Sequence, residues 1–355
     1  MTTPQIELYS LPFDDRTNRY FALWRAALER TGRVQARPVP PGGLLRLALS
    51  SSGKDKHRLL VIHWSTVIYG SRFALKSLLQ LAMNAVALLL LKMRGWTIFW
   101  VMHNAAAHDY PHPRIDRLGR ALVRSCADAV IVHQESTRKT FANAHARPPA
   151  VHIPHGHYRM IYGDRLKDQG EARVRYGFGP QDRVFLAFGM IRPYKRLEEI
   201  IDAFDRAPRH PSSLAKLWIV GKGDPGYVES LRRRSSSTNI RIENKFIPDE
   251  EIPAVLATAS YSPFFFDDSE LTSGGIILSL SYGVPIISRR IPAAEMALEG
   301  KSGFFFESAE GLSELIGRLS ETIPLTPEQV LESVELPGWD TVARSYIALY
   351  DSLHD

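Results

Sequence analysis

The sequence has only one cysteine, Cys126, in 355 residues, which excludes a disulfide within the chain and fits a reducing compartment such as the cytoplasm. The N-terminus lacks a basic segment followed by an apolar core, so we expect no signal peptide. The motif GxxxxGK[ST] is absent, as are GxSxG and a GxGxxG after the first predicted strand. These absences argue against a P-loop phosphotransferase, a serine hydrolase and a dinucleotide dehydrogenase.

Acidic residues are scarce in the first half of the chain. Residues 1–160 contain 22 Lys and Arg but 9 Asp and Glu (22 − 9 = +13), whereas the remainder carries 22 basic and 29 acidic residues (22 − 29 = −7). A basic half indicates an anionic partner such as phospholipid, a phosphorylated acceptor or nucleic acid. There is no zinc-ligand spacing, RNA-recognition signature or basic zipper, so we do not expect nucleic acid to be the partner.

Short apolar runs alternate with helical patterns along the whole chain, which predicts parallel α/β sheets. The predicted strands are 6–12, 59–64, 96–104, 128–134, 151–158, 183–191, 215–224, 240–246, 259–266 and 284–288. The pattern restarts after residue 180, and the length exceeds that of one usual core, so two similar domains are expected. We place them at 1–165, joined by the last helix 338–355, and at 175–337, with a polar linker within 158–180.

One apolar run, residues 77–91, is the best candidate for membrane contact. It is 15 residues long and contains Gln80 and Asn84, whereas a spanning helix needs about 20 apolar residues. We therefore interpret it as a buried or interfacial helix. The basic N-terminal half also suits peripheral contact with the inner face of the cytoplasmic membrane.

Two motifs in the second half suit a nucleoside diphosphate. In 188–201 (FGMIRPYKRLEEII), a strand ends at Gly189, and Arg192 and Lys195 follow in the turn before a helix. Two cations at this position can bind the oxygens of a diphosphate. The alternative is that they are ordinary solvated surface charges. In 267–287, a Thr-Ser-Gly-Gly sequence opens an apolar helix whose free amides form an anion site, or simply a capped helix start. These residues are Thr272, Ser273, Gly274 and Gly275, with Glu270 one turn earlier and Gly221 in a further glycine turn.

The first half offers candidates for a general base and for acceptor binding. After the strand 96–104, a loop holds His103, His108 and Asp109, where an imidazole or carboxylate can accept a proton. Asp109 and His108 are the best candidates for the general base. The alternatives are a structural loop and a metal site, although no spacing here matches a defined metal motif. The candidates for acceptor binding are His155 and His157 in IPHGHYR, and Asn18 and Arg19, which alternatively cap the helix 20–31.

Six motifs together resemble a known family. They occur in the order ADAVIVHQESTRKTF, IPHGHY, FGMIRPYKRLEEII, IVGKGD, IPDEEIPAVLATASYSPFFF and SELTSGGIILSLSYGVPII. The set resembles glycosyltransferases of the GT-B fold and is similar to their family 4 clan over nearly the whole chain. HGHYR, FGMIRPYKR and TSGGIILSLS resemble in particular the xanthan-type β-mannosyltransferases of family 94. The resemblance implies two Rossmann-like α/β/α domains facing across a cleft.

The resemblance also implies roles for individual residues. Arg192 and Lys195 correspond to the cations at the donor diphosphate, and Ser273 and Gly274 to the amides there. Glu270 falls on the first glutamate of the family 4 pair, which contacts the donor sugar. The second glutamate, which binds ribose, would fall on Leu278, so this chain departs from the standard retaining site. Phe246 and Ile247 match the segment that holds the base through backbone groups.

The resemblance to family 94 implies transfer of mannose from GDP-mannose, with inversion, to a polyprenyl-diphosphate-linked oligosaccharide. Such enzymes generally need no metal or other cofactor, and an N-terminal base such as Asp109 or His108 deprotonates the acceptor. The alternatives are a retaining family 4-like transferase with another nucleotide sugar, a sugar-nucleotide epimerase of the same fold, and an inactive glycan- or lipid-binding module.

Overall fold

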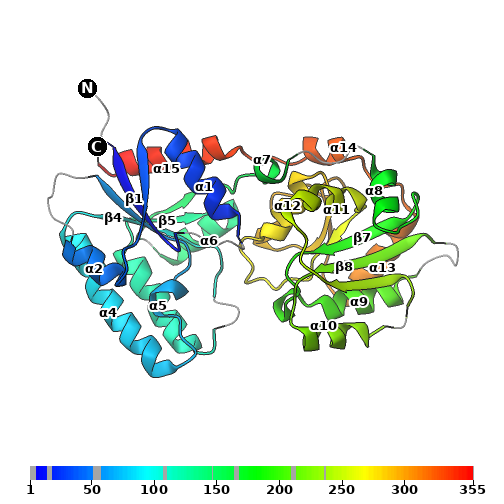
Figure 1. The fold of residues 1–355 in the computed structure, drawn as a ribbon, viewed down its shortest axis with the longest axis horizontal. Coiled ribbons are helices and arrows are strands. Elements are labelled where there is room, and N and C mark those ends of the chain that lie inside the picture. The colour runs from blue at the N-terminus through cyan, green and yellow to red at the C-terminus, as the bar shows by residue number, and fades with distance from the viewer. Residues whose placement is uncertain are drawn as a thin grey trace. The chain divides into compact units, whose positions relative to one another are not determined.

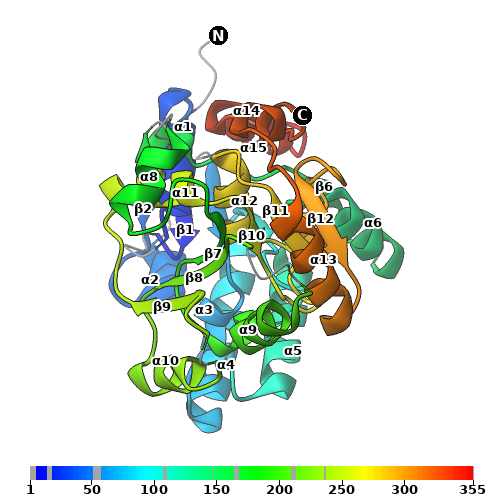
Figure 2. The same cartoon turned by 90° about the vertical axis from the view of Figure 1, so that its right-hand side faces the viewer.

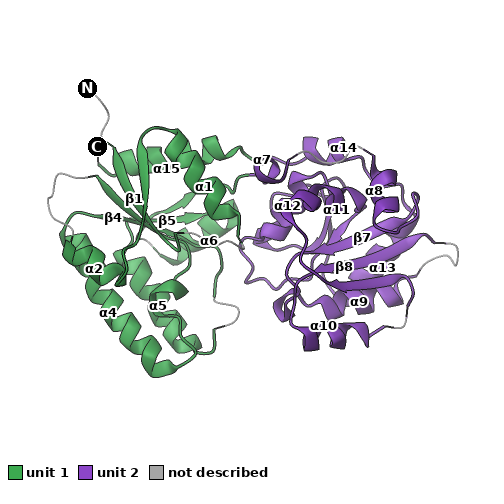
Figure 3. Cartoon of the chain, in the orientation of Figure 1, with its two compact units in different colours: residues 1–156, 337–355 green, residues 157–336 purple. Residues whose placement is uncertain are grey.

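The computed structural model describes residues 5–13, 18–50, 57–106, 110–145, 147–163, 168–208, 213–235 and 237–354. The chain divides into two units (Figure 3). Unit 1 contains Met1–Gly156 and Pro337–Asp355, and unit 2 contains His157–Leu336. The domain change therefore falls at Gly156, earlier than the position 165 predicted from the sequence.

Unit 1 is built on a parallel sheet with the strand order β2-β1-β3-β4-β5-β6. Its strands are β1 (Ile6–Leu11), β2 (Val34–Pro38), β3 (Arg58–Ile62), β4 (Thr97–Val101), β5 (Ala129–Val132) and β6 (Ala150–His152). Every residue of β3, β4 and β5 is buried, as expected for strands covered by helices on both faces. The sequence prediction missed β2, whose residues are half exposed, and made β6 too long.

Helices cover both faces of this sheet. They are α1 (Tyr20–Arg30), α2 (Gly43–Ser50), α3 (Thr66–Tyr69), α4 (Ala74–Met93), α5 (Pro113–Cys126), α6 (Glu135–Ala144) and the terminal α15 (Trp339–Asp351). Figure 1 shows α1 and α15 on one side of the sheet and α2, α4 and α5 on the other. Ion pairs from Arg30 to Asp340 and from Arg33 to Asp351 tie α15 to the start of the chain. This terminal helix therefore belongs to unit 1.

Unit 2 has two three-stranded parallel sheets, β7-β8-β9 and β10-β11-β12, joined by a bridge from Phe185 to Tyr261. Figure 2 shows these strands following one another across the unit. They are β7 (Arg183–Phe188), β8 (Ala215–Gly221), β9 (Ile240–Asn244), β10 (Ser262–Pro263), β11 (Ile286–Arg289) and β12 (Gly303–Phe306). The sequence prediction missed β12.

Helices also lie on both sides of this sheet, with α9, α10 and α13 on one side and α8, α11, α12 and α14 on the other (Figure 1). The α-helices are α7 (Arg159–Tyr162), α8 (Gln169–Arg175), α9 (Leu197–Arg206), α10 (Pro225–Arg232), α11 (Ile252–Thr258), α12 (Gly274–Ser281), α13 (Ala309–Glu321) and α14 (Pro327–Glu332). Short 3₁₀ turns are η1 (Pro193–Lys195), η2 (Asp249–Glu251) and η3 (Pro292–Ala294).

The predicted linker 158–180 is wrong for its described residues, because they form α7 and α8 and pack within unit 2. The guanidinium of Arg173 is buried and donates hydrogen bonds to the Thr258 carbonyl (3.1 Å) and the Ser260 hydroxyl (2.9 Å). Earlier in the segment, the Tyr158 amide donates to the Ser281 hydroxyl (3.1 Å). A polar sequence was mistaken for a linker because buried arginines are rare unless they are paired.

Candidate active site

The first candidate motif of unit 2 forms a tight turn between β7 and α9. Gly189 has a φ of +99°, a conformation that favours glycine, and it turns the chain out of the sheet. Pro193–Lys195 then form the 3₁₀ turn η1, which places the Lys195 ammonium 3.5 Å from the Phe188 carbonyl oxygen. Arg192 is exposed, whereas Lys195 is half-buried. The two cations therefore differ in solvation, although they are close in sequence.

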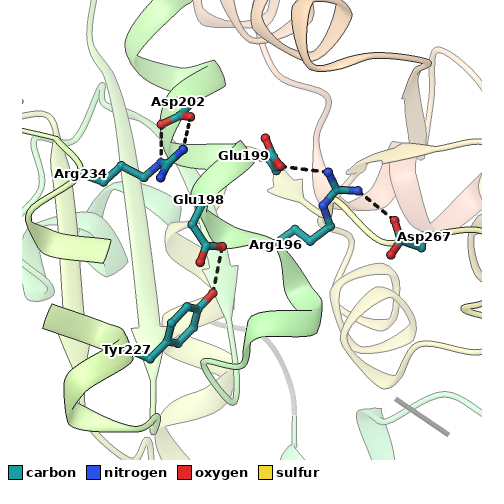
Figure 4. A network of polar contacts seen from close by, with 7 residues as sticks. All are labelled: Arg196, Glu198, Glu199, Asp202, Tyr227, Arg234 and Asp267. Atoms are coloured by element: carbon teal, nitrogen blue, oxygen red, sulfur yellow. Dashed lines mark hydrogen bonds and ion pairs between the residues drawn. The ribbon is translucent and has the colours of Figure 1, made fainter. Parts of the chain in front are cut away.

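A neighbouring arginine has a structural role that the sequence analysis did not assign. Arg196 bonds both Glu199 and Asp267 at 2.9 Å (Figure 4). In the same network Tyr227 donates to Glu198 (3.0 Å), and Arg234 forms a two-pronged pair with Asp202 (Figure 4). Arg196 thereby ties the start of α9 to the acidic segment that precedes α12. Its charge is already matched by carboxylates.

The second motif forms the N-terminus of α12. The Ser273 hydroxyl caps the helix by accepting from the Ile276 amide (3.4 Å), so the capping interpretation is observed. Gly274 is exposed, which leaves the helix-start backbone accessible to an anion. The Thr272 hydroxyl is buried, and no partner for it exists among the residues that the structure describes. A buried hydroxyl without a partner is costly, so a ligand oxygen here would satisfy it.

An electrostatic interaction between Lys195 of the first motif and Glu270, just before the second, links the two motifs within unit 2. Burial of Lys195 lowers the pKa of its ammonium to about 8, and the carboxylate of Glu270 acts in the opposite direction. Glu270 is itself buried. A lysine whose ammonium is partly desolvated and interacts with Glu270 suits a diphosphate, because the dianionic charge of the diphosphate would replace the lost hydration.

Two glycines let backbone segments cross beside this site. Gly189 donates to the Val220 carbonyl (3.0 Å), and Ile191 donates to that of Lys222 (2.9 Å). A Cβ on Gly221 would overlap the Gly189 carbonyl oxygen. The loop is held further by Asn244, whose side chain bonds both the amide and the carbonyl of Gly223. The glycine turn of 220–224 is therefore explained by close packing.

We expect Gly221→Ala to destabilise unit 2 by roughly 1–3 kcal/mol, because the methyl group must displace backbone. Chemical unfolding in urea measures this change. Gly311→Ala is the matched control, because its Cβ would make only ordinary contacts of 3.7–3.8 Å at the start of α13. Equal stability of the two variants would contradict the packing argument.

The two residues predicted to lie at the nucleobase follow the end of β9. Phe246 is 72% exposed, whereas Ile247 is buried. An exposed phenylalanine beside the glycine loop leaves an aromatic surface open to a ligand. Leu278 is buried in α12, one turn beyond Gly274. No carboxylate therefore stands at the position where the family pair would have its second glutamate.

One residue near the donor motifs was not identified from the sequence. Tyr158 is buried, and a Cβ on Gly274 would lie 3.4 Å from its hydroxyl, so this hydroxyl lies close to the start of α12. Burial raises its pKa, so the hydroxyl is protonated at neutral pH. The signal was present in HGHYR, where the histidines drew attention instead. His157 also belongs to unit 2 rather than to the predicted acceptor domain, since the division falls at Gly156.

In unit 1, four buried histidines follow four adjacent strands. They are His63 after β3, His103 after β4, His133 after β5 and His155 after β6. The ring of Tyr20 packs against all four, with centroid distances of 5.3, 5.2, 6.1 and 5.0 Å respectively. Carboxyl ends of parallel strands meet at one edge, which explains the cluster. Sequence reasoning identified His103 and His155 but missed His63 and His133.

Burial holds the pKa of each of these histidines below the usual range. The pKa falls to about 4 for His133 and to about 3 for His155, and it lies well below 6.5 for His63 and His103. All four rings are therefore neutral at pH 7. Nδ1 of His63 lies 3.4 Å from Nε2 of His103. His103 is thus placed to exchange hydrogen bonds, but it is a weak base.

A cavity of about 360 Å³ lies in unit 1 at this edge of the sheet. Its described lining residues are His63, Trp64, Ser65, Thr66, Trp100, Met102, His103, Asn104, Ala106, Tyr110 and Arg120. Arg120 is oriented by Asp116 (2.9 Å), which also accepts from the Tyr69 hydroxyl (2.6 Å). Aromatic surfaces with a few oriented polar groups are typical of small-ligand pockets of this size.

The remaining predicted residues have varied outcomes. Asn18 accepts a hydrogen bond from the amide of Tyr20, the first residue of α1 (3.1 Å), and Arg19 is the N-cap residue of that helix. His108 and Asp109 lie outside the described residues. Among the residues that are described, no group of three or more His, Cys, Asp and Glu side chains is arranged to hold a metal ion.

Comparison with known proteins identifies the class. Residues 168–325 match the family model described as glycosyl transferases group 1. Over 307 residues the chain is 22% identical to the GDP-mannose:glycolipid 4-beta-D-mannosyltransferase of Xanthomonas campestris pv. campestris, covering 83% of this chain and 80% of that protein. The fold of this chain is similar to that of Anabaena Alr3699/HepE in complex with UDP and glucose (TM-score 0.72, 15% identity, 98% of this chain and 100% of that one).

The fold is also similar to that of sucrose-phosphate synthase from Thermosynechococcus elongatus (TM-score 0.70, 13% identity, 99% of each chain). The two α/β units therefore have the GT-B fold. The group 1 match spans the motifs of unit 2 that were predicted to bind the donor, from β7 to α12. The protein is a nucleotide-sugar-dependent glycosyltransferase.

Proposed function

We propose that the enzyme transfers mannose from GDP-mannose, with inversion, to a polyprenyl-diphosphate-linked oligosaccharide or a related glycan acceptor in cell-surface polysaccharide synthesis. The observation that carries the donor part is the cluster of Lys195, Glu270 and the unsatisfied Thr272 hydroxyl at the start of α12. The choice of GDP-mannose and of a glycolipid acceptor is supported by the name of the Xanthomonas relative.

In this proposal the diphosphate of the donor binds Lys195, Arg192 and the amides that begin α12. Glu270 accepts hydrogen bonds from the donor sugar, and the backbone around Phe246 and Ile247 holds the nucleobase. As the glycosidic bond to the diphosphate breaks, negative charge grows on the leaving oxygen. Lys195 and the helix N-terminus stabilise that charge without any reorganisation.

The acceptor sugar binds in the cavity of unit 1, where Trp64 and Trp100 provide apolar surface and Arg120 a fixed cation. His155, Asn18 and Arg19 are proposed to act around the acceptor as positioning groups. The acceptor hydroxyl gives its proton to Asp109 or His108 as it attacks the anomeric carbon from the face opposite the diphosphate. His103 is proposed to orient that hydroxyl, because its low pKa makes it a poor proton acceptor.

A donor screen by thermal shift tests the proposal first. We expect GDP-mannose to raise the melting temperature by several degrees at about 100-fold excess over its Kd, equivalent to about 2.7 kcal/mol. UDP-glucose is the comparison donor, because the Anabaena neighbour was solved with UDP and glucose. A larger shift with UDP-glucose would overturn GDP-mannose and favour another nucleotide sugar.

Product analysis tests the stereochemistry and the metal requirement. Incubation with a polyprenyl-diphosphate-linked oligosaccharide, followed by NMR of the new anomeric proton, should show a β-linkage. An α-linked product would refute inversion and the base role of Asp109, and would favour a retaining family 4-like reaction. Turnover should be unchanged by EDTA, because the proposed site stabilises the diphosphate with protein cations.

A further inference from the structure

The helix α4 exposes an apolar stripe along its whole length. Each of its outward residues lies three or four positions from another of them, which places them on one face. They are Leu75, Leu78, Leu79, Met83, Val86, Leu89 and Met93, and the exposed fractions of Leu75, Leu79 and Met93 are 72%, 64% and 77%. The surfaces of monomeric soluble proteins rarely carry contiguous apolar patches of this extent, so the stripe marks an interaction surface.

The opposite face of α4 holds the helix against unit 1. Ser77, Ala87, Leu88 and Leu91 are buried, and the helix packs against α2, α3 and α5. Asn84 donates to the Ile68 carbonyl (2.7 Å) and anchors the middle of the helix. With 20 residues, α4 is long and apolar enough to cross a membrane by length and composition, and thus longer than the predicted 77–91. Its packed face instead keeps it along the surface of the unit.

Charge around the stripe is mainly of one sign, although Lys92 near the end of α4 pairs with Asp128. From residue 56 to residue 108 the sequence contains no Asp or Glu. Arg72 and Lys76 are exposed at the start of α4, and Arg114 and Arg117 are exposed on the flanking helix α5. Leu49 on α2 and Leu118 on α5 extend the exposed apolar surface beside them. A protein partner would be expected to meet a rim of mixed charge, whereas this pattern matches anionic headgroups above an apolar layer.

We propose that the α4 face is a membrane-docking surface that lies in the plane of an anionic lipid bilayer. The apolar stripe enters the boundary between headgroups and acyl chains, and the surrounding arginines and lysines bind lipid phosphates. The 20 residues span about 30 Å along the membrane surface at 1.5 Å per residue. The surface lies outside the donor motifs, and its role does not depend on which sugar is transferred.

Vesicle flotation with the full chain tests this proposal. We expect the wild-type protein to float with vesicles of phosphatidylcholine and phosphatidylglycerol, more weakly with phosphatidylcholine alone, and several-fold less in 0.5 M NaCl. The double variant Leu79→Glu/Val86→Glu should partition at least tenfold less. The matched control is Leu298→Glu/Ile323→Glu, which adds the same charges at exposed apolar positions of unit 2 and should bind as the wild type does.

Circular dichroism melting and the nucleotide-sugar thermal shift of unit 2 accompany the flotation assay. Both should be unchanged in the two double variants, which separates loss of docking from unfolding and from failure of the donor assignment. Equal flotation of the two double variants, or no flotation of the wild type, would overturn the proposal. So would a lipid-free dimer that Leu79→Glu/Val86→Glu converts to a monomer, because the stripe would then bind a second copy.

Discussion

Replacing Lys195 by alanine is expected to lower kcat/KM for sugar transfer by about 10²–10³-fold, equivalent to about 2.7–4 kcal/mol of transition-state stabilisation. The reason is the position of its ammonium, which lies beside Glu270 and the end of β7 in a desolvated setting. A charge in such a place interacts more strongly with a departing diphosphate than one in water. Initial rates with saturating acceptor measure the effect.

The control for this variant is Lys301→Ala, which removes an exposed lysine from unit 2 outside the donor motifs. It should leave kcat/KM within about twofold of the wild type, as is usual for surface substitutions. Wild-type turnover in Lys195→Ala would refute the diphosphate assignment. A nucleotide-sugar thermal shift should fall with the same variant, because the bond is made in the ground state as well.

The pH dependence of kcat/KM tests the role of Lys195 independently. Because burial lowers the pKa of Lys195 to about 8, its charge is present below that pH and is lost above it. The kcat/KM of the wild type should therefore fall with an alkaline limb near pH 8. Lys195→Arg should move this limb to higher pH, since guanidinium stays charged. An unmoved limb would assign it to another group.

Acidification is expected to unfold unit 1 because of its four buried histidines. Their pKa values in the folded protein lie below the ordinary value of about 6.5. Between that value and the folded pKa values, the unfolded chain therefore binds more protons than the folded chain. Stability is therefore fully present above pH 6.5 and is lost as the pH falls towards the folded pKa values. Each histidine contributes about 1.4 kcal/mol per pH unit in that window.

Between pH 6.5 and 5 the four groups together remove up to about 8 kcal/mol, which is comparable with the whole stability of a typical domain. Tryptophan fluorescence during urea titration measures this loss mainly in unit 1, which contains Trp24, Trp64, Trp96, Trp100 and Trp339 but not Trp218. His133→Asn should reduce the pH dependence by about one proton. A free energy of unfolding that is constant from pH 7 to 5 would contradict this account.

Much of the fold could be predicted from sequence where periodicity is strong. The strands β3, β4, β5, β7 and β8 are continuous apolar runs, and each lies where such runs were identified. The strand β2 was missed because its residues are mostly exposed and show no clear pattern. The strand β12 is a short apolar run and was missed because it has only four residues. The length of α4 was underestimated because Lys76 and Lys92 interrupt the apolar run without interrupting the helix.

The donor motifs show how far a local pattern extends. Turn residues, a helix cap and glycines act over a few positions, so the start of α12 and the turn after Gly189 could be identified from neighbouring residues alone. The coupling of Lys195 to Glu270 could not, because 75 positions separate them and only the parallel sheet brings them together. Tyr158 was missed because the histidines beside it in HGHYR drew attention instead, and only the fold places its hydroxyl close to the start of α12.

The sequence by itself determined the alternation of strands and helices and the charge asymmetry, because each depends on residue type and spacing. Only the tertiary structure decided which side chains are desolvated. It buried His63 and His133 beside Tyr20 and used Arg196 as a structural link. It also left Leu75, Leu79 and Leu89 of α4 exposed. Burial depends on what the rest of the chain places around a residue, and no local pattern contains that information.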